Sequence, residues 1–108
     1  MENKKDDNYF LERIKNSIDR INNVMNGVTY DEFVSNLDKQ DIAMFNLIQI
    51  SENAKQISEE YKREHKNIPW MDIYGLRNRI VHDYGNVELD IVYQTLNDDI
   101  PGLLNELF

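Results

Sequence analysis

The spacing of apolar residues predicts that the chain is helical throughout. From about Asn8 to Asn26, apolar side chains recur every three or four residues and share one helical face: Phe10, Leu11, Ile14, Ile18, Ile21 and Met25. Gly27 then acts as a C-terminal stop signal. The run Thr29-Tyr30-Asp31-Glu32 has the spacing of a capping box, which predicts a short second helix through Phe33 and Val34.

A third, longer helix is predicted from about Lys39 to Glu64. One apolar stripe along it contains Ala43, Leu47, Ile50, Ala54, Ile57 and Tyr61. A second stripe, roughly 100° or more away, contains Met44, Phe45 and Ile48 and continues to Glu52. A helix in a small bundle needs only one buried face, so the second stripe indicates a deeply central helix or a dimer surface. In a chain of this size we expect the dimer surface.

Two further helices complete the predicted fold. Pro69 pre-sets the first turn of a helix from about Trp70 to His82 or Tyr84, which Gly85 ends. A last segment from about Glu88 to Leu107 keeps one apolar stripe across Pro101, and this proline predicts a kink or short break near Asn97. The fold class is therefore all-α, an antiparallel bundle of four to five helices.

Composition narrows the class of protein. With 108 residues, 41% of them hydrophobic and 30% charged, the expected organisation is one soluble globular domain over residues 1–108. The longest apolar run, Ile42-Ala43-Met44-Phe45, is too short to cross a bilayer, and the N-terminus lacks an apolar signal segment. The absence of cysteine removes disulfides and thiolate chemistry. We expect a cytoplasmic protein without a membrane partner.

Charge is segregated along the chain. The net charge of −8 argues against a general nucleic-acid coat protein. Residues 62–82, however, carry a net charge of +3 and contain both histidines, His65 and His82. Such a patch either binds a phosphate locally or is an ordinary solvated helix end.

The fourth helix contains the candidate chemistry. Arg77 falls in the middle of an apolar face that Trp70, Ile73, Ile80 and Val81 define. A guanidinium there is costly unless it is paired or works at a wet interface, and Glu52 on the second stripe is the obvious partner. His82 lies five residues on, about 140° around the helix, so the two side chains need an unwound helix or two copies of the chain to share a pocket. Otherwise His82 simply caps the helix and favours its dipole.

The run from Gly75 to Tyr84 resembles the signature of the HEPN superfamily, specifically its HepT-like toxin branch. The branch pattern R-x-x-x-x-H-x-Y is met by Arg77, His82 and Tyr84, with the polar Asn78 after the arginine. The resemblance covers nearly the whole chain, because flanking segments also match: Ile68-Pro69-Trp70, Val87 to Tyr93, Tyr30, Phe33 and Ser51-Glu52-Asn53-Ala54. In the last segment the family usually has G-E-A-A, so Ser51 and Asn53 depart from its pattern.

The resemblance implies a homodimer whose R-x-x-x-x-H motifs meet in a composite, metal-independent ribonuclease site without a cofactor. Arg77 and His82 would be catalytic, with Asn78, Tyr84, Arg79 and Glu52 in supporting positions. The implied partner is a MntA-like minimal nucleotidyltransferase, the antitoxin of a type VII-like toxin–antitoxin pair, which transfers AMP to Tyr84. A basic rim for RNA would comprise Lys62, Arg63, Lys66 and Arg79.

Two other interpretations stay open from the sequence. The chain is a non-catalytic HEPN module that binds nucleotides or a partner, or it is a structural dimer in which Arg77 pairs with Glu52 across the interface and His82 caps the helix. A dry Arg77–Glu52 pair would favour structure, and an open cleft with both histidines exposed would favour catalysis. We expect Trp70 and Tyr74 to be core residues rather than platforms for RNA bases.

Overall fold

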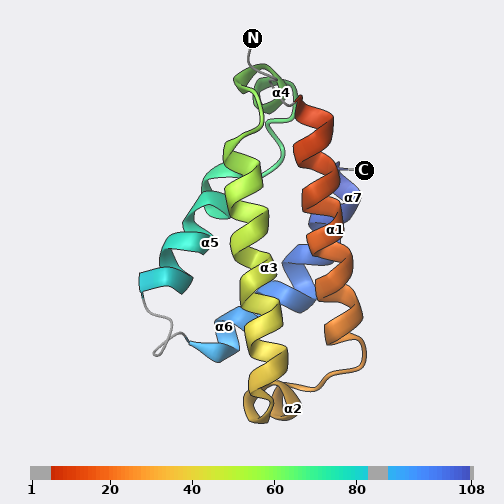
Figure 1. The fold of residues 1–108 in the computed structure, drawn as a ribbon, viewed down its shortest axis with the longest axis vertical. Helices are drawn as coiled ribbons and strands as arrows, with labels where there is room; N and C mark the ends of the chain where they lie inside the picture. The colour runs from red at the N-terminus through yellow and green to blue at the C-terminus, as the bar shows by residue number, and fades with distance from the viewer. Residues whose placement is uncertain (1–5, 83–87, 108) are drawn as a thin grey trace.

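Two long antiparallel helices form the centre of the molecule. The computed structural model describes residues 6–82 and 88–107. Helix α1 (Asp7–Met25) and helix α3 (Leu37–Lys55) run side by side along the long axis (Figure 1). The predicted stripes of both helices line the core between them, with exposed fractions of 1% or less at Ile14, Ile18, Ile21, Ala43, Leu47 and Ile50. The helical period therefore identified this part of the core correctly.

The predicted signals at the helix ends are confirmed. Helix α1 ends at Met25, and Gly27 has a φ of 72°, a left-handed conformation that glycine adopts without steric cost. The Thr29 hydroxyl accepts a hydrogen bond of 3.2 Å from the Glu32 N–H and begins helix α2 (Tyr30–Ser35). These two signals set the turn that brings α3 back along α1.

The prediction of one continuous helix over residues 39–64 is wrong. Helix α3 ends at Lys55, and a separate helix α4 (Glu59–Glu64) begins after Ser58. The Ser58 hydroxyl caps α4 by accepting from the Tyr61 N–H at 3.1 Å. The Ser58 N–H and hydroxyl also donate to the two carboxylate oxygens of Asp7, at 2.8 and 2.7 Å. The contact of Ser58 with Asp7 at the start of α1 thus stabilises the break between α3 and α4, where the sequence has no proline or glycine.

The remaining helices contact different parts of the central pair. Helix α5 (Trp70–His82) packs on α3, whereas the C-terminal helices pack on α1 and α2 (Figure 1). These are α6 (Leu89–Gln94), the π-helical segment η2 (Thr95–Asp99) and α7 (Ile100–Leu107). The irregular segment lies where Pro101 predicted a kink. Pro101 has no N–H that could donate to the Asn97 carbonyl, as an α-helix would require. Just before it, the Ile100 N–H donates to the Thr95 carbonyl five residues back, which is the hydrogen bond of a π-helix.

The fold is all-α, as predicted, and the described residues contain no strand. Two of the five expected helices are subdivided, at residues 56–58 and at η2. Residues 83–87, which include the expected stop Gly85, lie outside the described part of the chain. None of the described helices is both long and apolar enough to span a membrane.

Candidate functional site

The candidate site lies where α5 crosses α3. Ser51 on α3 is fully buried, and its hydroxyl donates a 3.2 Å hydrogen bond to the Tyr74 carbonyl on α5. This bond shows that the two helices approach closely at Ser51. Trp70, Ile73 and Ile80 are buried along α5, as predicted. The hydrogen bond between Ser51 and Tyr74 helps to hold α5 against α3, and it thereby positions the adjacent turn of each helix.

The apolar face of α5 is narrower than predicted. Val81 was expected on it but is 46% exposed. The C-terminal end of α5 diverges from α3 (Figure 1), so α3 does not cover that side of the last turn. Arg77 lies four residues before Val81 on the same side of the helix, and its side chain is 40% exposed. The guanidinium is therefore at the surface rather than buried.

Arg77 forms an ion pair with Glu52 of α3. The Arg77 Nε lies 3.0 Å from Glu52 Oε1, and the Glu52 side chain is 46% exposed. Since both groups keep contact with water, the pair avoids the desolvation penalty of a buried salt bridge. Glu52 is therefore the partner of Arg77, as expected, but the pair lies within one chain and is not dry, unlike the pair across an interface that the structural dimer required.

Within residues 6–82 and 88–107, the contacts of Arg77 occupy only part of its guanidinium. A guanidinium has five N–H donors, and Glu52 accepts from Nε. Nη1 lies 3.5 Å from the Asn78 side-chain oxygen, a long hydrogen bond to an exposed neighbour. Glu52 therefore orients the guanidinium plane while its terminal nitrogens remain suited to two phosphate oxygens.

Lys55 belongs to the same cluster and was missed by sequence reasoning. Its Nζ lies 4.0 Å from Glu52 Oε1, and its side chain is 38% exposed. The signal was its position three residues after Glu52 in the last turn of α3, where a lysine also favours the helix dipole. Glu52 is thus flanked by two cations, and the local charge of the three side chains is positive.

Within one chain, the His82 side chain does not lie on the same side of α5 as the Arg77 side chain. Helix α5 stays α-helical from Arg77 to His82, so no unwinding between them redirects the imidazole. The His82 side chain is exposed, about 140° around the helix from Arg77. What remains is a site shared by two copies of the chain or a histidine that favours the end of the helix dipole. The third motif residue, Tyr84, lies outside the described residues.

The expected basic rim is only partly present. Lys62 packs its ammonium over the rings of Trp70 and Tyr74, at 5.9 and 4.9 Å from the ring centroids, and its side chain is 11% exposed. Arg79 lines a groove between α5 and the C-terminal helices, about 200° around α5 from Arg77. Arg63 and Lys66 are exposed. Lys62 and Arg79 therefore do not lie as the rim hypothesis expected, and for the exposed Arg63 and Lys66 the rim stays a prediction.

The aromatic residues beside this patch are structural. Trp70 is 9% exposed, and its indole N–H donates to the His65 carbonyl at 3.1 Å. The His65 ring stacks on Tyr61, with centroids 3.9 Å apart. Trp70 is thus a core residue, as expected, and His65 is occupied in joining α4 to the loop before α5. In the part of the chain that is described, no three His, Asp or Glu residues are grouped as metal ligands.

Comparison with known proteins identifies the family. A sequence model described as "Ribonuclease HepT-like" matches residues 14–107, a range that contains Glu52 and the whole R-x-x-x-x-H-x-Y motif. The chain belongs to the ribonuclease HepT-like family. It is 29% identical over 94 residues to "Probable ribonuclease HepT" of Thermococcus cleftensis, covering 87% of this chain and 86% of that protein.

Other relatives of the HepT-like chain have similar names. It is 27% identical over 94 residues to a protein of Caldanaerobacter subterraneus subsp. tengcongensis whose name describes it as a candidate RNase, covering 87% of this chain and 84% of that protein. It is 25% identical over 104 residues to another candidate RNase, of Methanocaldococcus jannaschii, covering 96% of this chain and 95% of that protein. No solved structure matches the chain significantly.

Proposed function

We propose that this HepT-like chain is an endoribonuclease whose site combines residues of two copies, with Arg77 and His82 as its catalytic residues. The observation that carries the proposal is the Arg77 guanidinium, held at the surface by Glu52 at 3.0 Å and followed five residues later by the exposed His82. Family membership and the names of the relatives support RNA as the substrate.

The chemistry needs a base, an acid and a group that stabilises anionic oxygen. His82 of one copy takes the proton of an RNA 2′-hydroxyl, and the 2′-oxygen forms a bond to the adjacent phosphorus. The bond from phosphorus to the 5′-oxygen breaks, and the second copy's histidine protonates that oxygen. Imidazole suits both roles because it ordinarily titrates near neutral pH. Arg77 donates to the phosphate oxygens, where negative charge grows in the transition state.

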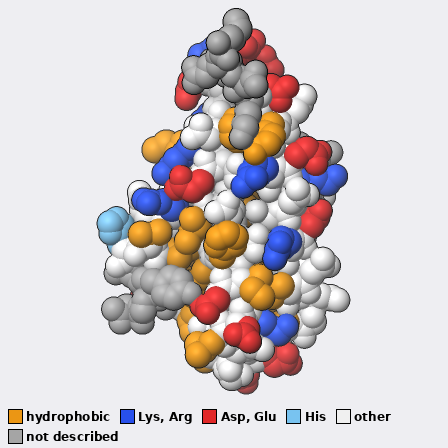
Figure 2. Space-filling view, viewed as in Figure 1, with side chains coloured by type: hydrophobic (Ala, Val, Ile, Leu, Met, Phe, Trp, Pro, Cys, Tyr) orange, Lys and Arg blue, Asp and Glu red, His pale blue; other side chains and the backbone are white. Residues whose placement is uncertain are grey.

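A dimer across the face of α3 and α5 would supply this arrangement. Phe45 is 60% exposed and lies two turns before Glu52 on the same side of α3, and Ile42 is 38% exposed one turn earlier. Val81 adds an exposed apolar side chain beside Arg77. Figure 2 shows hydrophobic side chains gathered on the face where α3 lies in front, with charged side chains around them. Of the predicted second stripe, Met44 is buried within the chain and Phe45 remains for a partner copy.

Phe45→Asp tests this surface through the oligomeric state. We expect the variant to stay folded, because Phe45 is largely exposed, and to sediment as a monomer with little RNA cleavage. Val34→Asp is the matched control, because Val34 is 42% exposed but lies on α2, outside the face of α3 and α5. A Phe45→Asp protein that stays dimeric would place the interface elsewhere.

The ribonuclease is tested by single-turnover cleavage of mixed cellular RNA with and without a chelator. We expect wild-type cleavage to persist in EDTA and His82→Ala to lower the rate about 10²-fold to 10⁴-fold. His65→Ala is the matched control, since it removes the other histidine of the basic segment. Equal rates for wild type and His82→Ala would reject the mechanism. RNA binding without cleavage by wild type would favour the non-catalytic module.

We further propose that a MntA-like nucleotidyltransferase silences the enzyme as its antitoxin. The Tyr84 oxygen would attack the α-phosphorus of ATP, release pyrophosphate and lose its proton to solvent, leaving a tyrosyl-AMP. The support is the motif, which places Tyr84 two residues after His82. The added phosphate is bulky and negative, so it opposes binding of RNA phosphates.

Intact mass after co-expression with such a nucleotidyltransferase tests this step. We expect one or more added AMP groups on wild type and none on Tyr84→Phe. Tyr93→Phe controls for the removal of a nearby tyrosine, because Tyr93 lies nine residues after Tyr84 in the sequence. No added mass on wild type would remove the antitoxin proposal and leave the ribonuclease proposal standing.

A further inference from the structure

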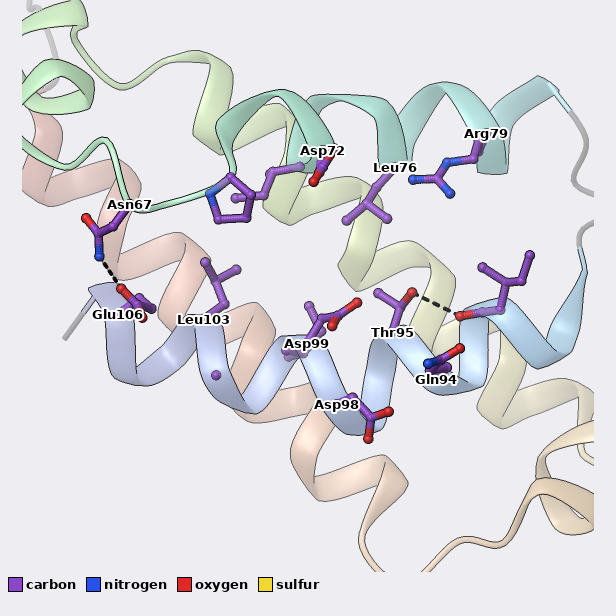
Figure 3. Close-up of a pocket in the computed structure, with 15 residues that line it drawn as sticks. Asn67, Asp72, Leu76, Arg79, Gln94, Thr95, Asp98, Asp99, Leu103 and Glu106 are labelled. Carbon is purple, nitrogen blue, oxygen red and sulfur yellow. Dashed lines mark hydrogen bonds between the residues drawn. The ribbon is translucent and has the colours of Figure 1, made fainter.

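A groove separates α5 from the C-terminal helices, on the side of α5 away from Arg77. It has a volume of about 700 Å³. Its floor is apolar, with Ile73, Ile100 and Leu103 at its base and the partly buried Leu76 above them. Figure 3 shows the two walls, α5 on one side and α6, η2 and α7 on the other. Ile91, which is 44% exposed, extends the apolar surface toward solvent.

The walls of the groove carry an excess of negative charge. Four acidic residues are among those that line it, against the single basic residue Arg79: Asp72, Asp98, Asp99 and Glu106. The Asp98 carboxylate points away from α5 (Figure 3). Asp72 projects from α5, and Asp99 projects from the opposite wall (Figure 3). Asp72, Asp98 and Asp99 form no salt bridge with any residue in the described ranges. Glu106 accepts a hydrogen bond from Asn67 and closes one end.

The charge and the shape of the groove together indicate which class of ligand it can bind. RNA is unsuited to the groove, because its phosphates would meet the carboxylates. A second copy's basic segment is also less suited, since Lys62 is packed against its own aromatic rings. We propose that the groove binds an amphipathic helix of a partner protein, with apolar residues at i, i+3, i+4 and i+7 on its floor and lysine or arginine along both walls. This is the helix-in-groove mode of recognition, with the charges adding specificity.

The proposal is independent of the ribonuclease activity, because the groove and Arg77 lie on different sides of α5. It assigns a role to the acidic C-terminal part of the chain, residues 83–108, which contains six acidic and no basic residues. It also assigns Arg79 to this groove instead of the RNA rim. Arg79 reduces the negative charge of the groove at the C-terminal end of α5.

The test measures binding of a designed peptide to the full chain by fluorescence anisotropy at low ionic strength. The probe is an amidated helical peptide of about 15 residues with leucines on one face and lysines beside them. A scrambled peptide of identical composition controls for charge alone. We expect wild type to bind the amphipathic peptide and to bind the scrambled one several-fold more weakly. Equal binding of both peptides would overturn the proposal.

Two chain variants locate the binding. Asp72→Asn/Asp99→Asn removes one carboxylate from each wall, and we expect it to weaken peptide binding about threefold to tenfold. Glu12→Gln/Asp19→Asn is the matched control, because it removes the same charge from exposed positions on α1. Equal weakening by both variants would show non-specific attraction and would reject the groove. Circular dichroism verifies that both variants stay helical.

Ile91→Asp tests the apolar part without emptying the core, because Ile91 is already largely exposed. We expect this variant to bind the amphipathic peptide more weakly and to have the same sedimentation coefficient as wild type. If Ile91→Asp instead converts a dimer to a monomer, the occupant is a second copy and the proposal is wrong. RNA cleavage measured in parallel keeps a failure of this proposal distinct from a failure of the ribonuclease.

Discussion

Replacing Glu52 by glutamine isolates its action on Arg77. Glu52 Oε1 lies 3.0 Å from the Arg77 Nε and 4.0 Å from the Lys55 Nζ. Glutamine keeps the length of the side chain and one oxygen acceptor but removes the charge. We therefore expect the Arg77 guanidinium to keep its approximate place and to be oriented less firmly, because its hydrogen bond to position 52 loses the charge of the acceptor.

The effect on stability should be small. At 3.0 Å, two unit charges attract by about 1.4 kcal/mol in a fully aqueous dielectric. The side chains are 40% and 46% exposed, so screening and lost side-chain entropy reduce the net gain to about 0.2–1 kcal/mol. For a domain of this size, a loss of 1 kcal/mol lowers Tm by about 4–8 °C. The expected decrease in Tm for Glu52→Gln is therefore below about 8 °C.

The effect on RNA cleavage should exceed the effect on folding. Arg77 acts on charge that develops in the transition state, so loss of its orientation lowers kcat more than it raises KM. We expect kcat to fall about tenfold in Glu52→Gln and further in Glu52→Ala, which removes the acceptor as well. Glu52 is in this sense a positioning residue.

The assay combines thermal unfolding with steady-state cleavage of one RNA. Glu59→Gln is the matched control, since it removes the same charge and the 3.8 Å pair with Lys62, away from Arg77. A double-mutant cycle of Glu52→Gln and Arg77→Lys measures the coupling between the two residues. If Glu52→Gln keeps the wild-type kcat, the positioning role is refuted. It is also refuted if the two substitutions lower kcat additively, because additive effects mean that the two residues are not coupled.

Three further predictions concern residues that the fold and the site depend on. Arg77→Lys should lower cleavage at least about tenfold, because lysine lacks the planar fork of donors, whereas Arg20→Lys on α1 should cleave normally; equal rates would remove Arg77 from the site. Gly27→Ala should destabilise the chain by about 1–2 kcal/mol, because the φ of 72° disfavours alanine, whereas Gly75→Ala inside α5, where an added Cβ meets no atom within 4 Å, should stabilise it by about 0.5–1 kcal/mol in urea unfolding. Hydrogen bonds from the Ser58 hydroxyl and N–H lower the pKa of Asp7 from 3.8, so wild type should be more stable than Asp7→Asn above that pH and lose the advantage as the pH falls through the lowered pKa; a difference that persists at lower pH would contradict this sign.

Local signals in the sequence predicted most of the helices. The apolar period identified α1 and α5, the capping box identified α2, and Pro101 located the irregular turn at η2. Each of these signals acts over a few residues of backbone, so it can be seen without the rest of the chain. The break between α3 and α4 was missed because Asp7, far away in the sequence, stabilises it.

For the candidate site, too, some features could be predicted from the sequence and others depended on the tertiary structure. The sequence by itself determined the motif, because Arg77, Asn78 and His82 are neighbours on one helix that local apolar spacing predicts. The sequence also suggested Glu52 as the partner of Arg77, but only the tertiary structure decided that this pair forms within one chain at the surface. It also decided that Lys55 joins the pair, that Val81 is exposed and that Arg79 faces the groove on the other side of α5. The reason is physical: helical periodicity fixes the angle between side chains, but the packing of α5 on α3 determines which angles are covered.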